Sequence, residues 1–316
     1  MAIAQQNDID LKGRDFISLH DFSAAEIYHM LDVAENLKLK QKSGKAHPLL
    51  QGKTLGMIFT KSSTRTRVSF EVAMYQLGGH SLFLSERDIQ LGRGETIPDT
   101  ARVLSRYLDG IMIRTYSHQD VLELAEFADI PIINGLTDLL HPCQVLADLL
   151  TIKEKKGNLN GLKLVYVGDG NNMAHSLMFG GAKMGMHVVI ASPQGYQPDP
   201  QVLHLAELDA HENGGQIELC SDPQTAVSGA DVIYTDVWAS MGQEAEQAQR
   251  IKDFQGFQVN QAMINLAQKD VIVMHCLPAH REEEISTEVL EGPHSVVFDE
   301  AENRLHAQKA ILALVM

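Results

Sequence analysis

The stretch LGMIFTKSSTRTRVSFEVAMYQLGG, residues 55–79, decides the fold class. It begins with the apolar run Leu55–Phe59, typical of a buried strand, and passes through KSSTRTR into a helical pattern that ends at Gly78-Gly79. A strand followed at once by a helix is the first part of a βαβ unit, so we expect a parallel sheet with helices on its faces. A largely buried surface is predicted for this helix by its apolar positions Val68, Phe70, Val72, Ala73, Met74, Tyr75 and Leu77.

The same alternation of strand and helix runs through the chain in two halves. A capping box, Ser23-x-x-Glu26, opens a helix that extends to about Gln41 before the first half. After a helix from Pro142 that ends at Lys155-Lys156-Gly157, the alternation restarts. Strands are expected at Leu55–Phe59, Ser81–Leu84, Gly110–Ile113, Ile130–Ile133, Leu162–Val167, His187–Ala191, Gln216–Leu219, Asp231–Tyr234 and Val271–Met274.

This pattern predicts an α/β protein of two doubly wound domains, each a parallel sheet flanked by helices. We expect residues 1–145 and 146–316 to form the domains, with a C-terminal helix from about Glu300 that packs back on the first. Ligands of such sheets bind beyond the carboxyl ends of the strands. The active site is therefore expected in the cleft between the domains.

Composition restricts the class of protein. The 316 residues are 44% hydrophobic, enough to bury a large core. The formal charge of −15, from 26 basic and 41 acidic residues, argues against duplex nucleic acid or an anionic membrane as partner. No signal peptide or membrane span is expected, so we expect a cytoplasmic protein. Cys143, Cys220 and Cys276 form no C-x-x-C pair and are expected to be reduced thiols.

KSSTRTR places hydroxyl groups and cations at the start of a helix. Backbone N–H groups and the helix dipole favour an anion there, and Ser63, Thr64, Arg65 and Thr66 add donors suited to phosphate oxygens. The segment predicts a phosphate site, although the hydroxyls can also serve as caps. Arg67 is expected outside the site, because it lies about 200° around the helix from Arg65.

Two further motifs follow strands. HPCQ, His141 to Gln144, stands at a helix start, where His141 can donate to an oxyanion and Gln144 offers an amide donor and acceptor. Both residues can equally be ordinary caps. HCLPAHR follows Val271–Met274, and its Leu277-Pro278 would leave backbone carbonyls to accept from an amide-like NH₂ group.

Cys276 in HCLPAHR permits two other interpretations. Its thiol can be a nucleophile activated by a nearby histidine, or it can bind a metal together with Cys143, His141 and His275. Neither has a supporting signature, since metal-ligand spacing and a family-specific nucleophile motif are both lacking. We therefore expect no metal.

GDGNN follows a strand and has the Gly-x-Gly start of a dinucleotide fingerprint. Met173 stands where the third glycine belongs, and Ser192-Pro193 after the next strand provides no acid for a ribose. A nicotinamide site is disfavoured. Asn171 and Asn172 instead offer amide groups to a small polar ligand.

DVWASMG, residues 236–242, follows the strand Asp231–Tyr234. Asp236 can pair with an ammonium group, and the small glycine-ended loop after it can close over a ligand. A plain surface loop is the alternative.

KSSTRTR, HPCQ, DVWASMG and HCLP, in this order and at these separations, resemble the aspartate/ornithine carbamoyltransferase family. The resemblance extends from the helix near Ser23 to the segment Glu300-Ala301-Glu302-Asn303-Arg304. STRT and HPxQ are shared by members that use different amines, whereas Ser-Met-Gly after Asp236 and the Cys of HCLP mark members that use ornithine. The resemblance implies transfer of the carbamoyl group of carbamoyl phosphate to the δ-amine of L-ornithine, giving citrulline and phosphate, in arginine synthesis or breakdown. No cofactor is implied.

The resemblance also implies roles for the first substrate. Arg114 would reach its phosphate and carbonyl, and Arg304 would add a cation. Thr66, Arg114 and His141 would polarise the carbamoyl oxygen. Its NH₂ group would be held by Gln144 and by the backbone carbonyls of Cys276 and Leu277. The phosphate would be held by Ser63, Thr64, Arg65 and Thr66.

For ornithine, the resemblance implies that Asn172 and the Met241 backbone bind the α-carboxylate. Asp236 and Ser240 would bind the α-ammonium, with Cys276 near the reacting amine. Gln90 in DIQLGRGE matches a position that reaches the phosphate site of a neighbouring subunit, which implies a homotrimer or a multiple of trimers.

Two alternative functions predict different residues at these positions. A paralogue that uses another amine, such as putrescine, would keep the phosphate residues but change Asn172, Asp236 or Ser240-Met241-Gly242. A non-catalytic binding subunit would lose Arg65, Arg114 or His141, and all three are present.

Overall fold

The computed structural model describes residues 9–91, 94–240, 242 and 244–316, and it divides into two compact units. Unit 1 runs to Asp138 and also includes Leu305–Met316, whereas unit 2 is Leu139–Arg304. The division lies ahead of the expected boundary at residue 145, so the whole of HPCQ belongs to unit 2. The last helix, α12 (Val297–Val315), is divided between the units after Arg304.

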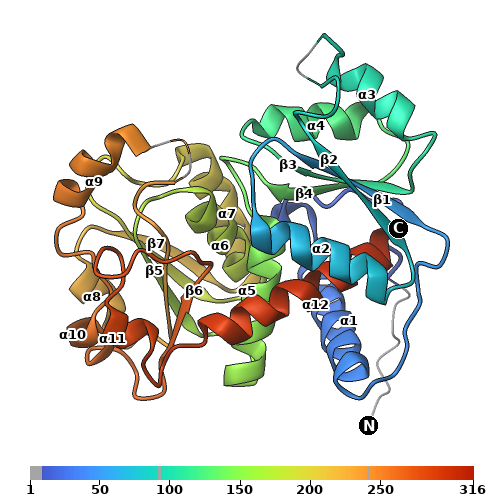
Figure 1. The fold of residues 1–316 in the computed structure, drawn as a ribbon. Helices are drawn as coiled ribbons and strands as arrows, with labels where there is room; N and C mark the ends of the chain where they lie inside the picture. The colour runs from blue at the N-terminus through green and yellow to red at the C-terminus, as the bar shows by residue number, and fades with distance from the viewer. Residues whose placement is uncertain (1–8, 92–93, 241, 243) are drawn as a thin grey trace. The chain divides into compact units, whose positions relative to one another are not determined.

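Unit 1 is built on a four-stranded parallel sheet in the order β2-β1-β3-β4. In Figure 1, α3 and α4 lie on one face of this sheet and α2 on the other, the arrangement of a doubly wound sheet. The elements are η1 (Leu19–Asp21), α1 (Ala24–Lys42), β1 (Thr54–Phe59), α2 (Thr64–Gln76), β2 (His80–Ser85), α3 (Ile97–Leu104), β3 (Gly110–Arg114), α4 (His118–Phe127) and β4 (Ile132–Leu136).

A local capping box defines the start of α1, and a long-range hydrogen bond holds the end of α12. The capping box before α1 is confirmed, because Ser23 Oγ accepts from Glu26 N and the Glu26 carboxylate accepts from Ser23 N at 2.7 Å. The end of α12 is held in unit 1, where Val315 O accepts from Gly13 N at 2.8 Å.

Unit 2 is built on a five-stranded parallel sheet in the order β7-β6-β5-β8-β9. Side chains from α8, α10 and α11 pack with β5, β8 and β9 in one buried apolar cluster. The elements, besides the first part of α12, are α5 (Pro142–Lys156), β5 (Lys163–Val167), α6 (Asn172–Lys183), β6 (His187–Ala191), α7 (Pro200–Asn213), β7 (Gln216–Cys220), α8 (Pro223–Val227), β8 (Val232–Thr235), η2 (Glu244–Glu246), α9 (Gln247–Asp253), α10 (Gln261–Ile264), β9 (Ile272–His275) and α11 (Thr287–Leu290).

The predicted fold class is confirmed, because both sheets are parallel, doubly wound and flanked by helices. Eight of the nine expected strands begin and end within one residue of the predicted range, and β4 differs by more. β4 runs from Ile132 to Leu136 instead of Ile130–Ile133, since the polar Asn134 continues the strand. Its backbone N donates to Phe16 O at 2.9 Å, and its side chain donates to Ile17 O at 3.1 Å. No helix in the described ranges has both the length and the apolar character needed to span a bilayer.

The predicted burial of α2 is partly wrong. Phe70, Ala73, Met74 and Leu77 are buried, but Val68 is 52% and Tyr75 82% exposed. The neighbouring edge strand β2 also exposes large side chains, so unit 1 carries an apolar surface. We call it the α2/β2 surface, and its residues are Val68 and Tyr75 of α2 and Phe83, which lies on the α2 face of β2 beneath Arg67.

Candidate active site

Several of the predicted site residues follow strands at the points where each strand order reverses, whereas HPCQ and HCLP follow the edge strands β4 and β9. In unit 1 the chain passes from β1 to β2 on one side and then to β3 on the other, and in unit 2 β5 and β8 separate in the same way. Doubly wound sheets bind ligands at such points. KSSTRTR follows β1 and Arg114 ends β3, while GDGNN follows β5 and Asp236 follows β8.

In unit 1, the start of α2 presents donors at this point. Ser63 is the N-cap, and its Oγ accepts from Thr66 N at 3.2 Å, so it also fills the capping role that the sequence allowed. Thr64 and Arg65 belong to the first turn, where N–H groups lack partners within the helix. Arg114 lies beside Phe59 of β1 in the sheet register and is 7% exposed. The carboxyl ends of β1 and β3 thus bring together two arginines, two threonines and a helix N-terminus. Such a setting is suited to phosphate.

The other cations of KSSTRTR have partners of their own. Arg67 pairs with Glu71 at 2.9 Å and its guanidinium lies 3.7 Å from the centre of the Phe83 ring, as expected for a residue outside the site. Lys61 is buried and its Nζ lies 3.1 Å from Asp138 Oδ1. Gln90 is exposed in the turn after β2.

In unit 2, HPCQ starts α5. His141 occupies the N-cap position and is 6% exposed, but its side chain makes no capping bond, so the cap interpretation is wrong for this residue. Its backbone N donates to Ser176 Oγ at 2.7 Å. Pro142 occupies the first turn as expected.

Gln144, in the first turn of α5, is buried in a polar network. Its Nε2 donates to Asp148 Oδ1 at 2.8 Å and to Glu300 Oε1 at 3.0 Å. Its Oε1 accepts from Arg304 Nη1 at 2.5 Å. Tyr234 of β8 also donates to Glu300 Oε1, at 3.0 Å. The amide is therefore anchored by charged side chains and is not a helix cap.

Asp236, after β8, is a buried carboxylate surrounded by neutral donors. Its Oδ1 accepts from Val237 N at 2.8 Å and from Cys276 Sγ at 3.1 Å, and its Oδ2 accepts from Asn171 Nδ2 at 3.1 Å. In the part of the chain that the structure describes, Asp236 forms no ion pair. A buried carboxylate in such surroundings suits a cationic ligand.

The Cys276 thiol is held in its protonated form. Burial, together with the neighbouring Asp236 carboxylate, raises the pKa of Cys276 well above its ordinary value. A nucleophilic cysteine needs the thiolate, so the interpretation of Cys276 as a nucleophile is disfavoured.

His275 supports the loop that follows β9. Its Nδ1 accepts from Leu277 N at 2.9 Å, and its Nε2 contacts Glu284 Oε1 at 3.0 Å. The acceptor role of Nδ1 fixes the proton on Nε2. Glu284 Oε1 also accepts from His280 N at 2.6 Å, and Leu277 has a positive φ of 56°. The loop carbonyls of Cys276 and Leu277 are thus held by a buried histidine and a buried glutamate.

The metal grouping considered from the sequence is not found among the described residues. Two described clusters have suitable spacing, Asp236-His275-Cys276 and His280-Glu283-Glu284, and neither includes Cys143 or His141. Both ring nitrogens of His275 in the first cluster are already hydrogen-bonded. Burial raises the pKa of Cys143 to about 12, which keeps it a thiol.

The second glycine of GDGNN, Gly170, is required by the packing of the backbone. A Cβ on Gly170 would lie 2.3 Å from Pro198 N, so the close approach of two backbone segments requires glycine. Asn171 caps α6, where its Oδ1 accepts from Met173 N at 2.9 Å. Its amide is therefore used inside the protein, against the expectation that it faces a ligand. Asn172 is the first residue of α6 and is 9% exposed.

The start of DVWASMG is not a plain surface loop. Trp238 is buried, and Arg250 Nη1 donates to Trp238 O and to Asp169 Oδ2, both at 2.8 Å. Arg250 thus joins this loop to GDGNN. Ser240 is half-buried, and the predicted ligand Met241 lies outside the described residues.

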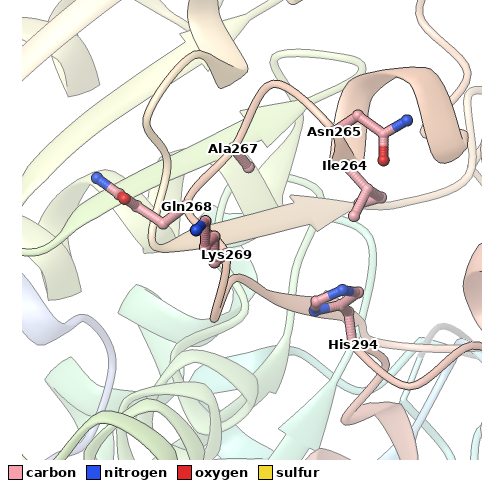
Figure 2. A pocket seen from close by; sticks show the side chains of 6 residues that line it. All are labelled: Ile264, Asn265, Ala267, Gln268, Lys269 and His294. Atoms are coloured by element: carbon pink, nitrogen blue, oxygen red, sulfur yellow. The ribbon is translucent and has the colours of Figure 1, made fainter.

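A separate hollow of about 240 Å³ lies before β9, at the amino end of that strand (Figure 2). This is the opposite end of the strand from Cys276. The hollow is lined by Ile264, Asn265, Ala267, Gln268, Lys269 and His294, and it contains none of the predicted site residues.

Sequence reasoning missed three buried carboxyl groups, on Asp148, Glu300 and Glu284. Asp148 lies four residues after Gln144, so the helical spacing alone placed the two side chains together. Glu300 lies 156 residues from Gln144 in the sequence, and Glu284 lies nine residues from His275 across an irregular loop, so no helix or strand period indicates either contact.

Two family models together match most of the chain. The model described as "Aspartate/ornithine carbamoyltransferase, carbamoyl-P binding domain" matches residues 14–154, and the one described as "Aspartate/ornithine carbamoyltransferase, Asp/Orn binding domain" matches residues 160–315. The ornithine carbamoyltransferase of Oceanobacillus iheyensis is 63% identical over 307 residues, which are 97% of this chain and 95% of that protein. The anabolic ornithine carbamoyltransferase of Pyrococcus furiosus is 61% identical over 98% of both chains. A solved structure of ornithine carbamoyltransferase from Pyrococcus furiosus superimposes with a TM-score of 0.95 over 98% of each chain, at 61% identity.

Proposed function

The chain belongs to the aspartate/ornithine carbamoyltransferase family, and we infer that it transfers the carbamoyl group of carbamoyl phosphate to the δ-amine of L-ornithine. The products are L-citrulline and phosphate. The observation that carries the choice of amine is Asp236, a buried carboxylate that forms no ion pair among the described residues and lies beside Cys276. The α-ammonium group of ornithine fits this carboxylate, and its α-carboxylate, which putrescine lacks, fits the Asn172 amide.

Unit 1 is the carbamoyl-phosphate-binding domain in this proposal. The N–H groups of the first turn of α2 and the hydroxyls of Ser63, Thr64 and Thr66 receive the phosphate oxygens, and Arg65 adds its charge. Arg114 contacts both phosphate and carbonyl oxygen. The support is the arrangement at the ends of β1 and β3, where these residues are neighbours in one unit.

The carbamoyl group has an oxygen that accepts hydrogen bonds and an NH₂ group that donates them, so each needs its own partners in the protein. Its oxygen faces Thr66, Arg114 and His141, which stabilise the negative charge that develops when the amine attacks. Its NH₂ group donates to Gln144 Oε1 and to the carbonyls of Cys276 and Leu277. Arg304, which already bonds to Gln144 Oε1 at 2.5 Å, adds a positive charge to this region.

Unit 2 is the ornithine-binding domain. Asp236 and Ser240 bind the α-ammonium group, and Asn172 with the Met241 backbone binds the α-carboxylate. The neutral δ-amine attacks the carbamoyl carbon, a C–N bond forms, and the C–O bond to phosphate breaks, while the amine loses one proton, which the departing phosphate accepts. Cys276 lies near that amine as a protonated thiol and takes no proton from it, because its pKa is raised.

We extend the proposal to assembly and location: a cytoplasmic homotrimer, or a multiple of trimers. The α2/β2 surface supports association through unit 1, since an exposed apolar surface of this kind marks a protein contact. Gln90, exposed after β2, would then serve the phosphate site of a neighbouring subunit. Mixed trimers of Arg65→Ala and Gln90→Ala subunits should regain activity that neither variant has alone. No recovery after verified subunit exchange would contradict a role for Gln90 across the interface.

The reaction is tested with a panel of amines. The purified protein is given carbamoyl phosphate with L-ornithine, putrescine, L-aspartate or an acylated ornithine, and the ureido product of each is quantified. We expect citrulline to dominate. A larger yield from putrescine would favour the alternative paralogue, and no product from any amine would refute the proposed function.

A further inference from the structure

The network around Gln144 contains a pair of carboxyl groups that the proposed chemistry does not use. Asp148 is fully buried on α5, and Glu300 is 1% exposed on the unit 2 part of α12. Both accept from the same nitrogen, Gln144 Nε2, at 2.8 and 3.0 Å. The two carboxyls thus lie against each other in the interior, a costly arrangement that calls for a reason.

One arginine lies beside the pair. Burial raises the pKa of both carboxyls, and each disfavours a second negative charge beside it, so a proton between them is favoured. Arg304, which bonds to the other end of the same amide, places a positive charge beside the pair. The proton and the arginine both lower the cost of burying two carboxyl groups together.

This arrangement allows only one orientation of the Gln144 amide. The carboxyl oxygens accept from the NH₂ group, and the guanidinium can only donate to the carbonyl oxygen. A rotation of the amide by 180° would place oxygen against oxygen and N–H against N–H, with the loss of all three hydrogen bonds. The carbonyl oxygen therefore stays on the Arg304 side as an acceptor.

Glu300 also connects this amide to the loop after β9. Its second oxygen, Oε2, accepts from His275 N at 2.9 Å, and His275 directly precedes Cys276 and Leu277. Tyr234 completes the environment with a 3.0 Å bond to Glu300 Oε1. One carboxyl group thus restrains both the Gln144 amide and the segment that supplies the two backbone carbonyls.

We propose that Asp148 and Glu300 are positioning residues that hold the acceptors for the carbamoyl NH₂ group, and so make the enzyme select carbamoyl phosphate over an acyl phosphate that lacks this donor. The inference rests on the proposed role of Gln144 in binding carbamoyl phosphate. Acetyl phosphate, with a methyl group in place of NH₂, is the matched probe. It would leave the oriented acceptors unpaired, at a cost in affinity.

The test compares two affinities in each variant: KM for carbamoyl phosphate and the inhibition constant of acetyl phosphate. Glu300→Gln replaces one of the two acceptor oxygens by an NH₂ group. This group would face the N–H of His275 or the Nε2 of Gln144, both donors, so one of the two hydrogen bonds is lost. We expect KM for carbamoyl phosphate to rise about tenfold, as for one lost hydrogen bond, while acetyl phosphate inhibition stays within about threefold. Asp299→Asn, a neighbouring acid on the surface, is the control and should change neither constant.

A pair of substitutions at Asp148 supplies a second measurement if Glu300→Gln is unstable. Asp148→Asn can still accept from Gln144 and can donate to Glu300, so discrimination should be preserved. Asp148→Leu fills a similar volume with no acceptor, so discrimination should fall about tenfold. A merely structural role would instead weaken both phosphates equally or lower only the melting temperature.

The outcomes separate this inference from the proposed function. Citrulline formation by the unsubstituted protein establishes the function independently of any variant. If that protein is active and the ratio of the two constants is unchanged in Glu300→Gln and in Asp148→Leu, the positioning role is refuted and the function stands. If it forms no citrulline, the proposed function fails first.

Discussion

The candidate site residues lie at the carboxyl ends of the strands in both sheets, and these two places share a topology and differ in charge. We call the one in unit 1 the anion-binding edge and the one in unit 2 the ammonium-binding edge. At the reversal point of unit 1, Arg65 and Arg114 accompany the start of a helix. At the reversal point of unit 2, Asp236 and Asn171 accompany the start of another helix, and no basic residue pairs with Asp236 among those described. One edge therefore suits an anion and the other an ammonium group, although the backbone arrangement is the same.

The topology therefore determines where a ligand binds, and the side chains that follow the strands determine which charge the ligand must carry. In unit 1 the donors are mostly local, since Ser63, Thr64 and Arg65 belong to one helix start. In unit 2 the carboxylate depends on partners from other segments, because Asp236 receives bonds from Asn171 and Cys276. Substitutions at the two edges should therefore affect different substrates.

The largest effect is expected at the anion-binding edge. Arg65→Ala removes a charge-assisted contact to phosphate and should lower kcat/KM for carbamoyl phosphate by about 10³-fold or more, with the fold retained. Arg67→Ala is the matched control on the same helix. Because Arg67 pairs with Glu71, its loss should cost no more than about fivefold. Steady-state kinetics and circular dichroism measure both, and equal losses in the two variants would contradict the phosphate site.

The next effect is expected at the ammonium-binding edge. Asp236→Asn keeps the shape but removes the charge, and should lower kcat/KM for ornithine by about 10²- to 10³-fold, as for a broken buried ion pair. Calorimetry should show carbamoyl phosphate binding with nearly unchanged affinity. Asp270→Asn changes an exposed acid of unit 2 and serves as control. Undiminished turnover of ornithine by Asp236→Asn would remove the distinction between the two edges.

A smaller effect should come from the amide that holds Asp236. Asn171→Ser keeps an oxygen to cap α6 but loses the donor to Asp236 Oδ2, so KM for ornithine should rise about tenfold. Asn260→Ser is the matched control, because Asn260 caps α10 in the same way and has no contact with the site. If both variants behave alike, Asn171 is only a cap.

The two edges also differ in how far the sequence predicted them. Strand ranges and the α2 cap followed from periodicity and from Ser63, because these depend on neighbours in the chain. The burial of Tyr75 was predicted wrongly, since periodicity marks an apolar face without showing what covers it. Asp236 was found by its place after a strand. Its link to Asn171 and the contact of Glu300 with Gln144 span 65 and 156 residues, and no local pattern encodes them.

Buried charge gives the last contrast between the units. In unit 2 Arg304 lies beside the buried pair Asp148 and Glu300, whereas in unit 1 Lys309 is fully buried and has no carboxylate among its hydrogen-bond partners in the described residues. Its Nζ donates to Gln41 Oε1 at 2.9 Å and Gln76 Oε1 at 3.0 Å, and it lies 3.4 Å from His47 Nε2. Burial lowers the pKa of Lys309 from 10.5 to about 8.

This shift predicts a pH-dependent stability. Between pH 8 and 10.5 the unfolded chain binds a proton at Lys309 that the folded chain has released, so the free energy of unfolding rises with pH in this range. Below pH 8 the destabilisation is complete, at about 1–3 kcal/mol. Lys309→Met should therefore have the larger free energy of unfolding at pH 7, and this advantage over the unsubstituted protein should disappear towards pH 10.5.

Lys45→Met, a substitution of an exposed lysine of the same unit, is the control for the change in net charge. Urea unfolding at pH 7, 8.5 and 10, at one protein concentration, measures the difference. An advantage of Lys309→Met that is equal at all three pH values would mean that packing, and not the buried charge, separates the two proteins.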